Sequence, residues 1–225
     1  MMWQFLRFWF YRLFIVDCVG CGSLVVHARG LCLSCEYHIL DHYLYSQVEA
    51  ATVPESGLRF RFLFNWIPGE SSLLSSYVYL LKSPLAEPLW HELSRYFVPP
   101  EHLKNNVIFI PIPSRKKRKH SLYLAQGLAE QLGGEVIEAL QTSALDSLEQ
   151  KQKSKTERRK ITFTLIEEFT ERLRLAPAIV LVDDVITTGA SYEAAYNVLK
   201  NHQVCLENIE LWTAFYREAI RVNFE

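Results

Sequence analysis

The chain has 225 residues, 49% of them hydrophobic, and its 24 Lys and Arg against 25 Asp and Glu give a formal net charge of −1. A chain of this length and apolar content can bury a core and still build a smaller second unit, which excludes a disordered protein. A net charge close to zero excludes a general attraction to nucleic acid, so any such binding must come from local groups of cations.

The first sixteen residues, MMWQFLRFWFYRLFIV, are apolar and aromatic but are interrupted by Arg7 and Arg12. They are too short to span a bilayer, and no small-residue cleavage site follows them, so we predict neither a transmembrane span nor a cleaved signal. Helical spacing places the two arginines roughly on one side of an amphipathic aromatic helix over residues 1–17. We expect this helix to pack against the rest of the protein, with contact to a membrane surface as the alternative.

Four of the five cysteines form a C-x2-C-x10-C-x2-C pattern, which defines a module over residues 18–40. Two short knuckles of this spacing can each present two thiolates to one tetrahedral ion, and zinc in a closed structural site is the expected metal. Iron–sulfur ligation is the alternative, and the pattern favours a reducing compartment over disulfides. The predicted ligands are Cys18, Cys21, Cys32 and Cys35.

The remaining chain is predicted to contain a small cap over residues 41–104 and a main domain over residues 105–225. In the cap, strand-like alternation over 57–67 and a Pro-Gly turn precede two helices, over 73–82 and 85–97. In the main domain, strands near 108, 136, 162, 180 and 210 are separated mostly by helices. This order predicts an open parallel α/β sheet that binds its ligand at the carboxyl edge.

Two stretches of the main domain concentrate positive charge. Residues 115–119 and 151–160 together hold 11 of the 24 Lys and Arg, and only Glu157 opposes them. They predict contact with a pyrophosphate or a nucleic-acid backbone, the alternative being solvated loops that keep the protein soluble. The candidate contact residues are Arg115, Lys116, Lys117, Arg118, Lys119, Lys151, Lys153, Lys155, Arg158 and Arg159.

The most specific pattern in the chain runs from Ala178 to Ser191. A β-branched run predicts a buried strand, Asp183 and Asp184 follow it, and a helix is expected from Ser191 to Lys200. The small residues between acids and helix would let backbone N–H groups converge on one anion. Because two acids repel a bare phosphate, the pair predicts a ligand that also carries vicinal hydroxyls or a divalent cation, as ribose 5-phosphate can. Helix capping, the alternative, explains Ser191 but not the acid pair.

This stretch resembles the PRPP motif of type I phosphoribosyltransferases, in which the acids hold the ribose 2′ and 3′ hydroxyls and the loop holds the 5′-phosphate. The resemblance implies a type I phosphoribosyltransferase-like sheet and Mg²⁺ bound together with PRPP, with Asp183 and Asp184 in the catalytic role. The residues that it assigns to PRPP are Asp183, Asp184, Val185, Thr187, Thr188, Gly189, Ala190 and Ser191, joined by Ser114 and Arg115.

Over nearly its whole length the chain is similar to the ComF/GntX family of phosphoribosyltransferase-like proteins. Besides the four-cysteine module and the PRPP motif, the matching segments are Leu80-Leu81-Lys82, Ile110-Pro-Ile-Pro113, and Gln150 with Glu157-Arg158. The resemblance implies natural transformation: handling of incoming single-stranded DNA in the bacterial cytoplasm, alongside other competence proteins. Contact of residues 1–17 with the inner membrane would make the protein peripheral there.

The chain departs from this family at two points. It has His120-Ser-Leu-Tyr-Leu124 where the family usually has Arg-Gly-Phe-Asn-Gln, and Ile161 replaces the Asn that usually follows Glu-Arg. We therefore predict a PRPP-binding protein that handles single-stranded DNA. The alternative is an active phosphoribosyltransferase of nucleotide salvage or nucleobase metabolism, whose basic loops stabilise the departing pyrophosphate. A scaffold that has lost its ligand is the third hypothesis.

Overall fold

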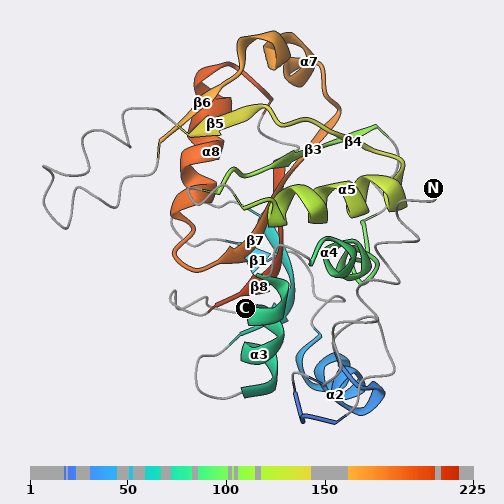
Figure 1. Cartoon of the computed structure of the whole chain (residues 1–225). Helices are drawn as coiled ribbons and strands as arrows, with labels where there is room; N and C mark the ends of the chain where they lie inside the picture. The colour runs from blue at the N-terminus through green and yellow to red at the C-terminus, as the bar shows by residue number, and fades with distance from the viewer. Residues whose placement is uncertain are drawn as a thin grey trace, which may run out of the picture.

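The structure, a computed structural model, describes residues 18, 20–23, 31–44, 51–52, 59–66, 72–82, 86–100, 103, 106–114, 118–142, 162–205 and 209–217. The fold is α/β and is built on a six-stranded sheet in the order β1-β2-β8-β7-β3-β4 (Figure 1). From β2 to β4 all neighbours are parallel, whereas β1 is antiparallel to β2. The strands are β1 Ala51–Thr52, β2 Arg59–Asn65, β3 Val107–Pro111, β4 Glu135–Val136, β7 Ala178–Ile186 and β8 Ile209–Tyr216.

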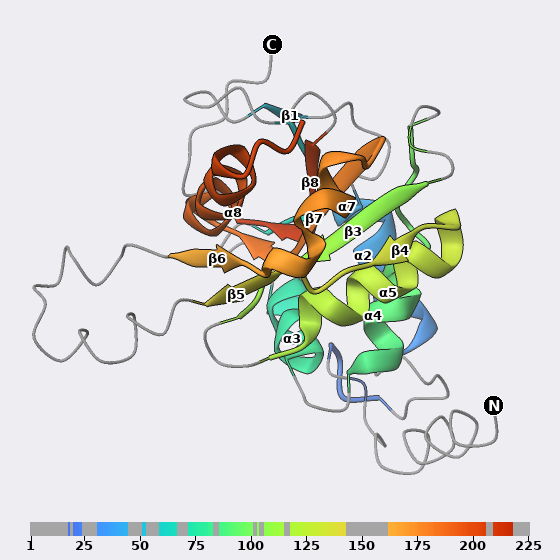
Figure 2. The same ribbon diagram turned by 90° about the horizontal axis from the view of Figure 1, so that it is seen from above.

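Helices cover both faces of this sheet (Figure 2). One face packs against α2 to α5, and the other packs against α7, α8 and a separate antiparallel pair of strands, β5 and β6. The helices are α2 Leu33–Tyr43, α3 Ser72–Leu81, α4 Glu87–Ser94, α5 His120–Leu132, α7 Thr170–Arg174 and α8 Ala190–Asn201, with a 3₁₀ turn, η4, at Glu167–Phe169; β5 is Leu140–Thr142 and β6 is Phe163–Leu165.

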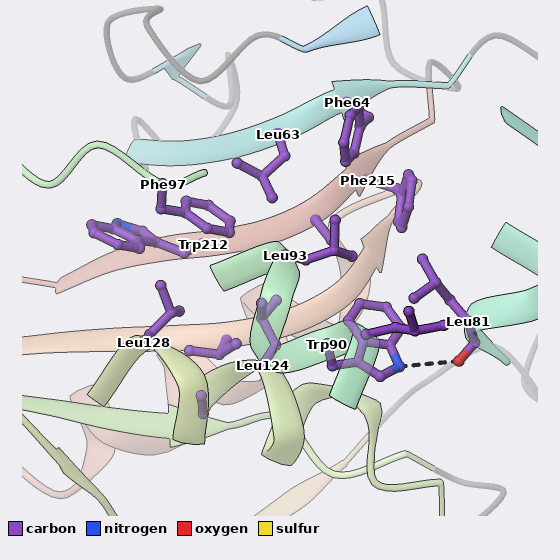
Figure 3. Packing of buried hydrophobic residues seen from close by; sticks show 14 of the residues in the cluster. Leu63, Phe64, Leu81, Trp90, Leu93, Phe97, Leu124, Leu128, Trp212 and Phe215 are labelled. Atoms are coloured by element: carbon purple, nitrogen blue, oxygen red, sulfur yellow. Dashed lines mark hydrogen bonds between the residues drawn. The ribbon is translucent and has the colours of Figure 1, made fainter. Parts of the chain in front are cut away.

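The core on the α4–α5 side is rich in aromatic rings (Figure 3). Phe97 stacks on Trp212 with ring centroids 5.2 Å apart, and Phe64 stacks on Phe215 at 5.3 Å. Trp90 is also buried, and its indole N–H donates to the Leu81 carbonyl at 3.0 Å, which satisfies the one polar atom of the ring. The end of α3 is thereby tied to α4 and to the sheet.

The predicted strand near 162 is present as β6, but its expected place in the main sheet is wrong. β6 pairs with β5 in the two-stranded sheet, and the fifth parallel strand is β2, which comes from the stretch expected to form the cap. The burial of the two strands explains why β2, and not β6, is the fifth parallel strand. Phe62, Leu63 and Phe64 of β2 are all buried, as an interior strand requires, whereas β6 has three residues that alternate buried, exposed, buried.

Other predicted elements are confirmed, with shifted ends. β7 runs from Ala178 to Ile186, so both acids lie within the strand and not after it. Helix α8 begins at Ala190, one residue before the expected start. Helix α5 ends at Leu132, and its C-cap residue is Gly133, whose φ of +70° suits glycine. Within the described part of the chain, no helix has both the length and the apolarity that a bilayer crossing needs. The predicted amphipathic helix over residues 1–17 lies outside the described residues.

Candidate functional site

The acid pair lies at the carboxyl edge of the sheet, on the central strand β7. Successive side chains of a strand point to opposite faces, so Asp184 faces α5 and Asp183 faces the other side. Backbone hydrogen bonds hold both carboxylates: the Asp184 N–H donates to Asp183 Oδ1 at 2.8 Å, and the Val185 N–H donates to Asp184 Oδ1 at 2.9 Å. The two carboxylates are therefore anchored on the strand before any ligand arrives.

His120, the first residue of α5, supplies a second contact to Asp184. Its Nδ1 lies 3.2 Å from Asp184 Oδ2, and its side chain is only 6% exposed. The imidazole stacks on Trp90, with ring centroids 5.3 Å apart and planes 20° apart. Ser121 Oγ donates to the Ile112 carbonyl at 2.7 Å, which fastens the start of α5 to the chain leaving β3. His120 can thus orient Asp184, but it is too deeply buried to be a surface ligand.

His120 is not among the residues that the sequence patterns assign to the site; it is only part of the segment that departs from the ComF/GntX pattern. One signal could have placed His120 near the site. Helices that follow parallel strands begin at the carboxyl edge of the sheet, and His120 is a polar residue at the start of the helix after β3. Its partner could not be predicted, since Asp184 lies 64 positions further along the chain.

Burial and charge give the two carboxyl groups of the pair different pKa values. Burial, and then the negative charge of Asp184, raise the pKa of Asp183 well above its ordinary value. Burial also pushes the pKa of Asp184 upward, but the hydrogen bonds from His120, Asp183 and the Val185 N–H outweigh it and leave that pKa lowered. Asp184 therefore ionises first as pH rises. A cation or hydroxyl donors at this edge would favour ionisation of Asp183 as well.

The loop after β7 leads directly into the amino terminus of α8. Gly189 is the N-cap residue with a φ of +75°, a left-handed conformation that glycine adopts without strain. No side chain caps this helix, and the Ala190 N–H reaches Thr188 Oγ1 only at 3.5 Å. The first backbone N–H groups of a twelve-residue helix are thus available at the sheet edge, where they favour an anion.

The predicted PRPP residues after β7 lie together on this loop and on the first turn of α8. Ser114 follows the neighbouring strand β3 at the same edge, where the Ile112 N–H donates to the Val182 carbonyl at 2.8 Å. Arg118 and Lys119 are exposed and directly precede α5. The other predicted cations lie outside the described residues: Arg115, Lys116, Lys117, Lys151, Lys153, Lys155, Arg158 and Arg159.

The four predicted metal ligands form one cluster. The Sγ atoms of Cys18, Cys21, Cys32 and Cys35 all lie within 4.8 Å of one another, which is compatible with one tetrahedral ion. Backbone N–H groups point at two of the sulfurs: that of Cys32 lies 3.2 Å from Cys18 Sγ, and that of Cys35 lies 3.5 Å from Cys32 Sγ. These donors stabilise thiolates, the form that binds metal.

The electrostatics of the cluster favour a bound cation. The hydrogen bond from the Cys35 N–H, assisted by Ser23, lowers the pKa of Cys32 to about 6, whereas burial raises the pKa of Cys35. Deprotonating all four thiols without a cation would place several negative charges side by side, and a divalent ion removes that cost. The space is also tight: a Cβ on Gly20 would lie 2.9 Å from Cys35 Sγ and 2.2 Å from Leu73 Cδ1.

A scan against models of known protein families and a search of curated protein sequences found no match to this chain. What the fold and the site define is therefore a class: an α/β protein whose parallel sheet ends in an acid pair beside a helix amino terminus, with a separate cluster of four cysteines.

Proposed function

We propose that this protein is a PRPP-binding, phosphoribosyltransferase-like protein that handles single-stranded DNA in natural transformation. The observation that carries the proposal is the run from β7 to α8: two anchored carboxylates on the central strand, a short loop, and an uncapped helix amino terminus. One end of this run suits hydroxyls or a cation and the other suits a phosphate. A ribose 5-phosphate carries both kinds of group on one small ring.

Each part of the site has a role in this proposal. The loop from Thr187 to Ser191 binds the 5′-phosphate, and Asp183 and Asp184 bind the ribose hydroxyls and Mg²⁺. Mg²⁺ supplies positive charge that offsets the pyrophosphate when PRPP is bound. His120 keeps Asp184 in the orientation that its two hydrogen bonds define. The cations from Arg115 to Lys119 serve the pyrophosphate or the phosphates of a strand.

The four cysteines hold structural zinc in this proposal. All four ligand positions of a tetrahedral ion are taken by protein sulfur, which leaves no open position for a substrate. The ion fixes the knuckle at Cys18 against the start of α2, since Cys35 lies in the first turn of that helix. A cytoplasmic location, peripheral to the inner membrane through residues 1–17, accords with the use of reduced cysteines.

An active phosphoribosyltransferase is the second candidate, and the fixed orientation of Asp184 favours it. A carboxylate held by a buried histidine is preorganised, as catalysis requires, whereas a simple binding surface gains less from such rigidity. Release of pyrophosphate from PRPP in the presence of nucleobases separates the two candidates. Steady release supports the enzyme, and saturable binding without release supports the binding protein.

Titration calorimetry with PRPP and Mg²⁺ tests the proposal. The double variant Asp183→Asn/Asp184→Asn keeps the shape of both side chains but removes their charge. The control Asp41→Asn removes an exposed carboxylate from α2. We expect saturable, Mg²⁺-dependent binding to the wild type and the control, and its loss in the double variant. Absence of binding to the folded wild-type protein would overturn the PRPP proposal.

A further inference from the structure

A row of alternating cations and aromatic rings lies at the carboxyl edge of β2 and β8. Arg217 Cζ lies 5.1 Å from the ring centroid of Trp66, and Lys82 Nζ lies 5.7 Å from the same ring on Trp66 and 5.7 Å from the ring of Tyr79. The order is therefore cation, ring, cation, ring. We call these four residues the cation–aromatic row: Arg217, Trp66, Lys82 and Tyr79.

The backbone places this row next to the candidate site. The Trp66 N–H donates to the Tyr216 carbonyl at 2.6 Å, and the Arg217 N–H donates to the Ile186 carbonyl at 2.9 Å. Trp66 thus extends β2 by one residue, two strands away from the end of β7. Because neighbouring strands are about 4.8 Å apart, the backbone of Trp66 lies about 10 Å from the start of the β7–α8 loop.

Helix α3 supplies the other half of the row. The Trp66 indole N–H donates to Ser75 Oγ at 3.2 Å, and Tyr79 and Lys82 follow Ser75 at spacings of four and seven residues. This spacing sets the three residues on one face of a helix, along which the indole lies. Leu81, the residue before Lys82, accepts the hydrogen bond of the Trp90 indole (Figure 3). Trp90 in turn stacks on His120, the partner of Asp184. The end of α3 therefore adjoins the row and is linked to Asp184 through Trp90 and His120.

The charges and the exposure of the row suit a ligand with phosphates and flat rings. Tyr79 is 74% exposed, Arg217 is exposed and Lys82 is half-buried. Among the described residues, neither Lys82 nor Arg217 forms an ion pair with a carboxylate. Cation–π pairs occur about once per 70–80 residues, so three pairs around two rings are a local concentration.

We propose that the cation–aromatic row is a binding site for single-stranded DNA, with phosphates at Lys82 and Arg217 and an unpaired base on Tyr79. Single-strand binding surfaces combine a positive track with aromatic side chains on which bases stack, and the row has both in alternation. A single strand suits the row better than a duplex, because the bases of a duplex are already stacked on each other and none is free to stack on Tyr79. This inference rests on the DNA-handling part of the proposed function and names residues that the two basic stretches do not include.

The test is fluorescence anisotropy of the full chain with a labelled fifteen-nucleotide oligo-deoxythymidylate, an abasic oligomer of equal length and a duplex. Lys82→Gln/Arg217→Gln removes the two cations, and Tyr79→Ala removes the most exposed ring. Lys200→Gln/Arg172→Gln is the charge-matched control, because α7 and α8 lie on the other face of the sheet. Thermal unfolding of each variant shows that it is folded.

We expect the double variant to bind the oligothymidylate more weakly and with a log–log salt slope smaller by about 1.4, since each single-strand phosphate contact contributes about 0.7. Tyr79→Ala should weaken oligothymidylate binding by about fivefold to a hundredfold and leave the abasic oligomer unaffected. The control should match the wild type, and the duplex should bind less tightly than the single strand.

The possible outcomes distinguish a failure of the cation–aromatic row from a failure of the proposed function. If the wild type binds single strands and the row variants bind with the same affinity and salt slope, the row is a structural feature only and this inference is overturned. If the wild type binds PRPP but no single strand, the DNA part of the proposed function is overturned together with the row. Tighter binding of the duplex than of the single strand would also overturn the inference.

Discussion

His120 Nδ1 lies 3.2 Å from Asp184 Oδ2 and so joins the start of α5 to the central strand β7. The contact is enclosed, because the imidazole is 6% exposed and stacks on Trp90. It is also the only described side-chain partner of the acid pair outside β7 itself. The geometry of the candidate PRPP site therefore depends on how α4 and α5 pack, and not only on the β7–α8 segment.

Replacing His120 should destabilise the protein. His120→Ala removes a hydrogen bond to a charged group, worth about 1.5–3 kcal/mol, and opens a cavity under Trp90. We expect the free energy of unfolding in urea at pH 7 to fall by at least about 1.5 kcal/mol. His42→Ala, at an exposed position on α2, is the control and should change it by less than about 0.5 kcal/mol. Equal effects of the two substitutions would contradict this account of His120.

Asp183→Asn should stabilise the Mg²⁺-free protein at neutral pH. The pKa of Asp183 is raised in the folded state, so the folded state binds more protons than the unfolded state between the unfolded and the folded pKa. Stability contributed by this group is therefore present at low pH and is lost as pH rises through that window. The Asn side chain retains an oxygen for the Asp184 N–H.

Urea unfolding of wild type and Asp183→Asn between pH 4 and pH 8 measures this effect. The advantage of the variant should grow as pH rises. Asp184→Asn should behave differently: the pKa of Asp184 is lowered from 3.8, so its stabilising contribution is fully present across this range and is lost only as pH falls below 3.8. A difference between wild type and Asp183→Asn that does not vary with pH would refute the assignment.

The four-cysteine cluster should hold about one zinc ion per chain. Cys32→Ser removes the sulfur that accepts the Cys35 N–H, and we expect it to lose the metal and to lower the melting temperature. Cys205→Ser is the matched control, because Cys205 is exposed and lies outside the cluster. Elemental analysis of the purified proteins measures the zinc content of each. Iron in place of zinc, together with visible absorption, would support the iron–sulfur alternative.

Gly127→Ala should be destabilising, although alanine normally favours a helix by about 1 kcal/mol over glycine. At this position on α5 a Cβ would lie 2.6 Å from Ser94 Oγ and 2.9 Å from His91 Cα, where α4 crosses α5. Overpacking of this kind costs about 1–3 kcal/mol. Gln131→Ala, at an exposed position on the same helix, should stay within about 0.5 kcal/mol of wild type in urea unfolding. A stabilised Gly127→Ala protein would show that the helices do not approach this closely.

The parts of the site that are local in the chain could be predicted from the order of residues alone. The strand, acid pair, loop and helix between Ala178 and Asn201 form one continuous segment, and the run of apolar residues followed by small polar ones predicts each part. The four cysteines were predictable for the same reason, because the two pairs are close in sequence and their spacing matches the size of a metal ion. Short-range constraints of this kind are present in the order of residues alone.

Contacts between segments that are distant in the chain could not be predicted in this way, because they depend on tertiary packing. Alternation in residues 57–67 predicts a strand, but the place of β2 beside β8 depends on its burial on both faces. β6 is buried on one face only, and it lies outside the main sheet. The contact of His120 with Asp184, and the row of Arg217, Trp66, Lys82 and Tyr79, join residues from separate elements. Side-chain contacts across elements arise from packing of the whole core, and no periodicity within one segment encodes them.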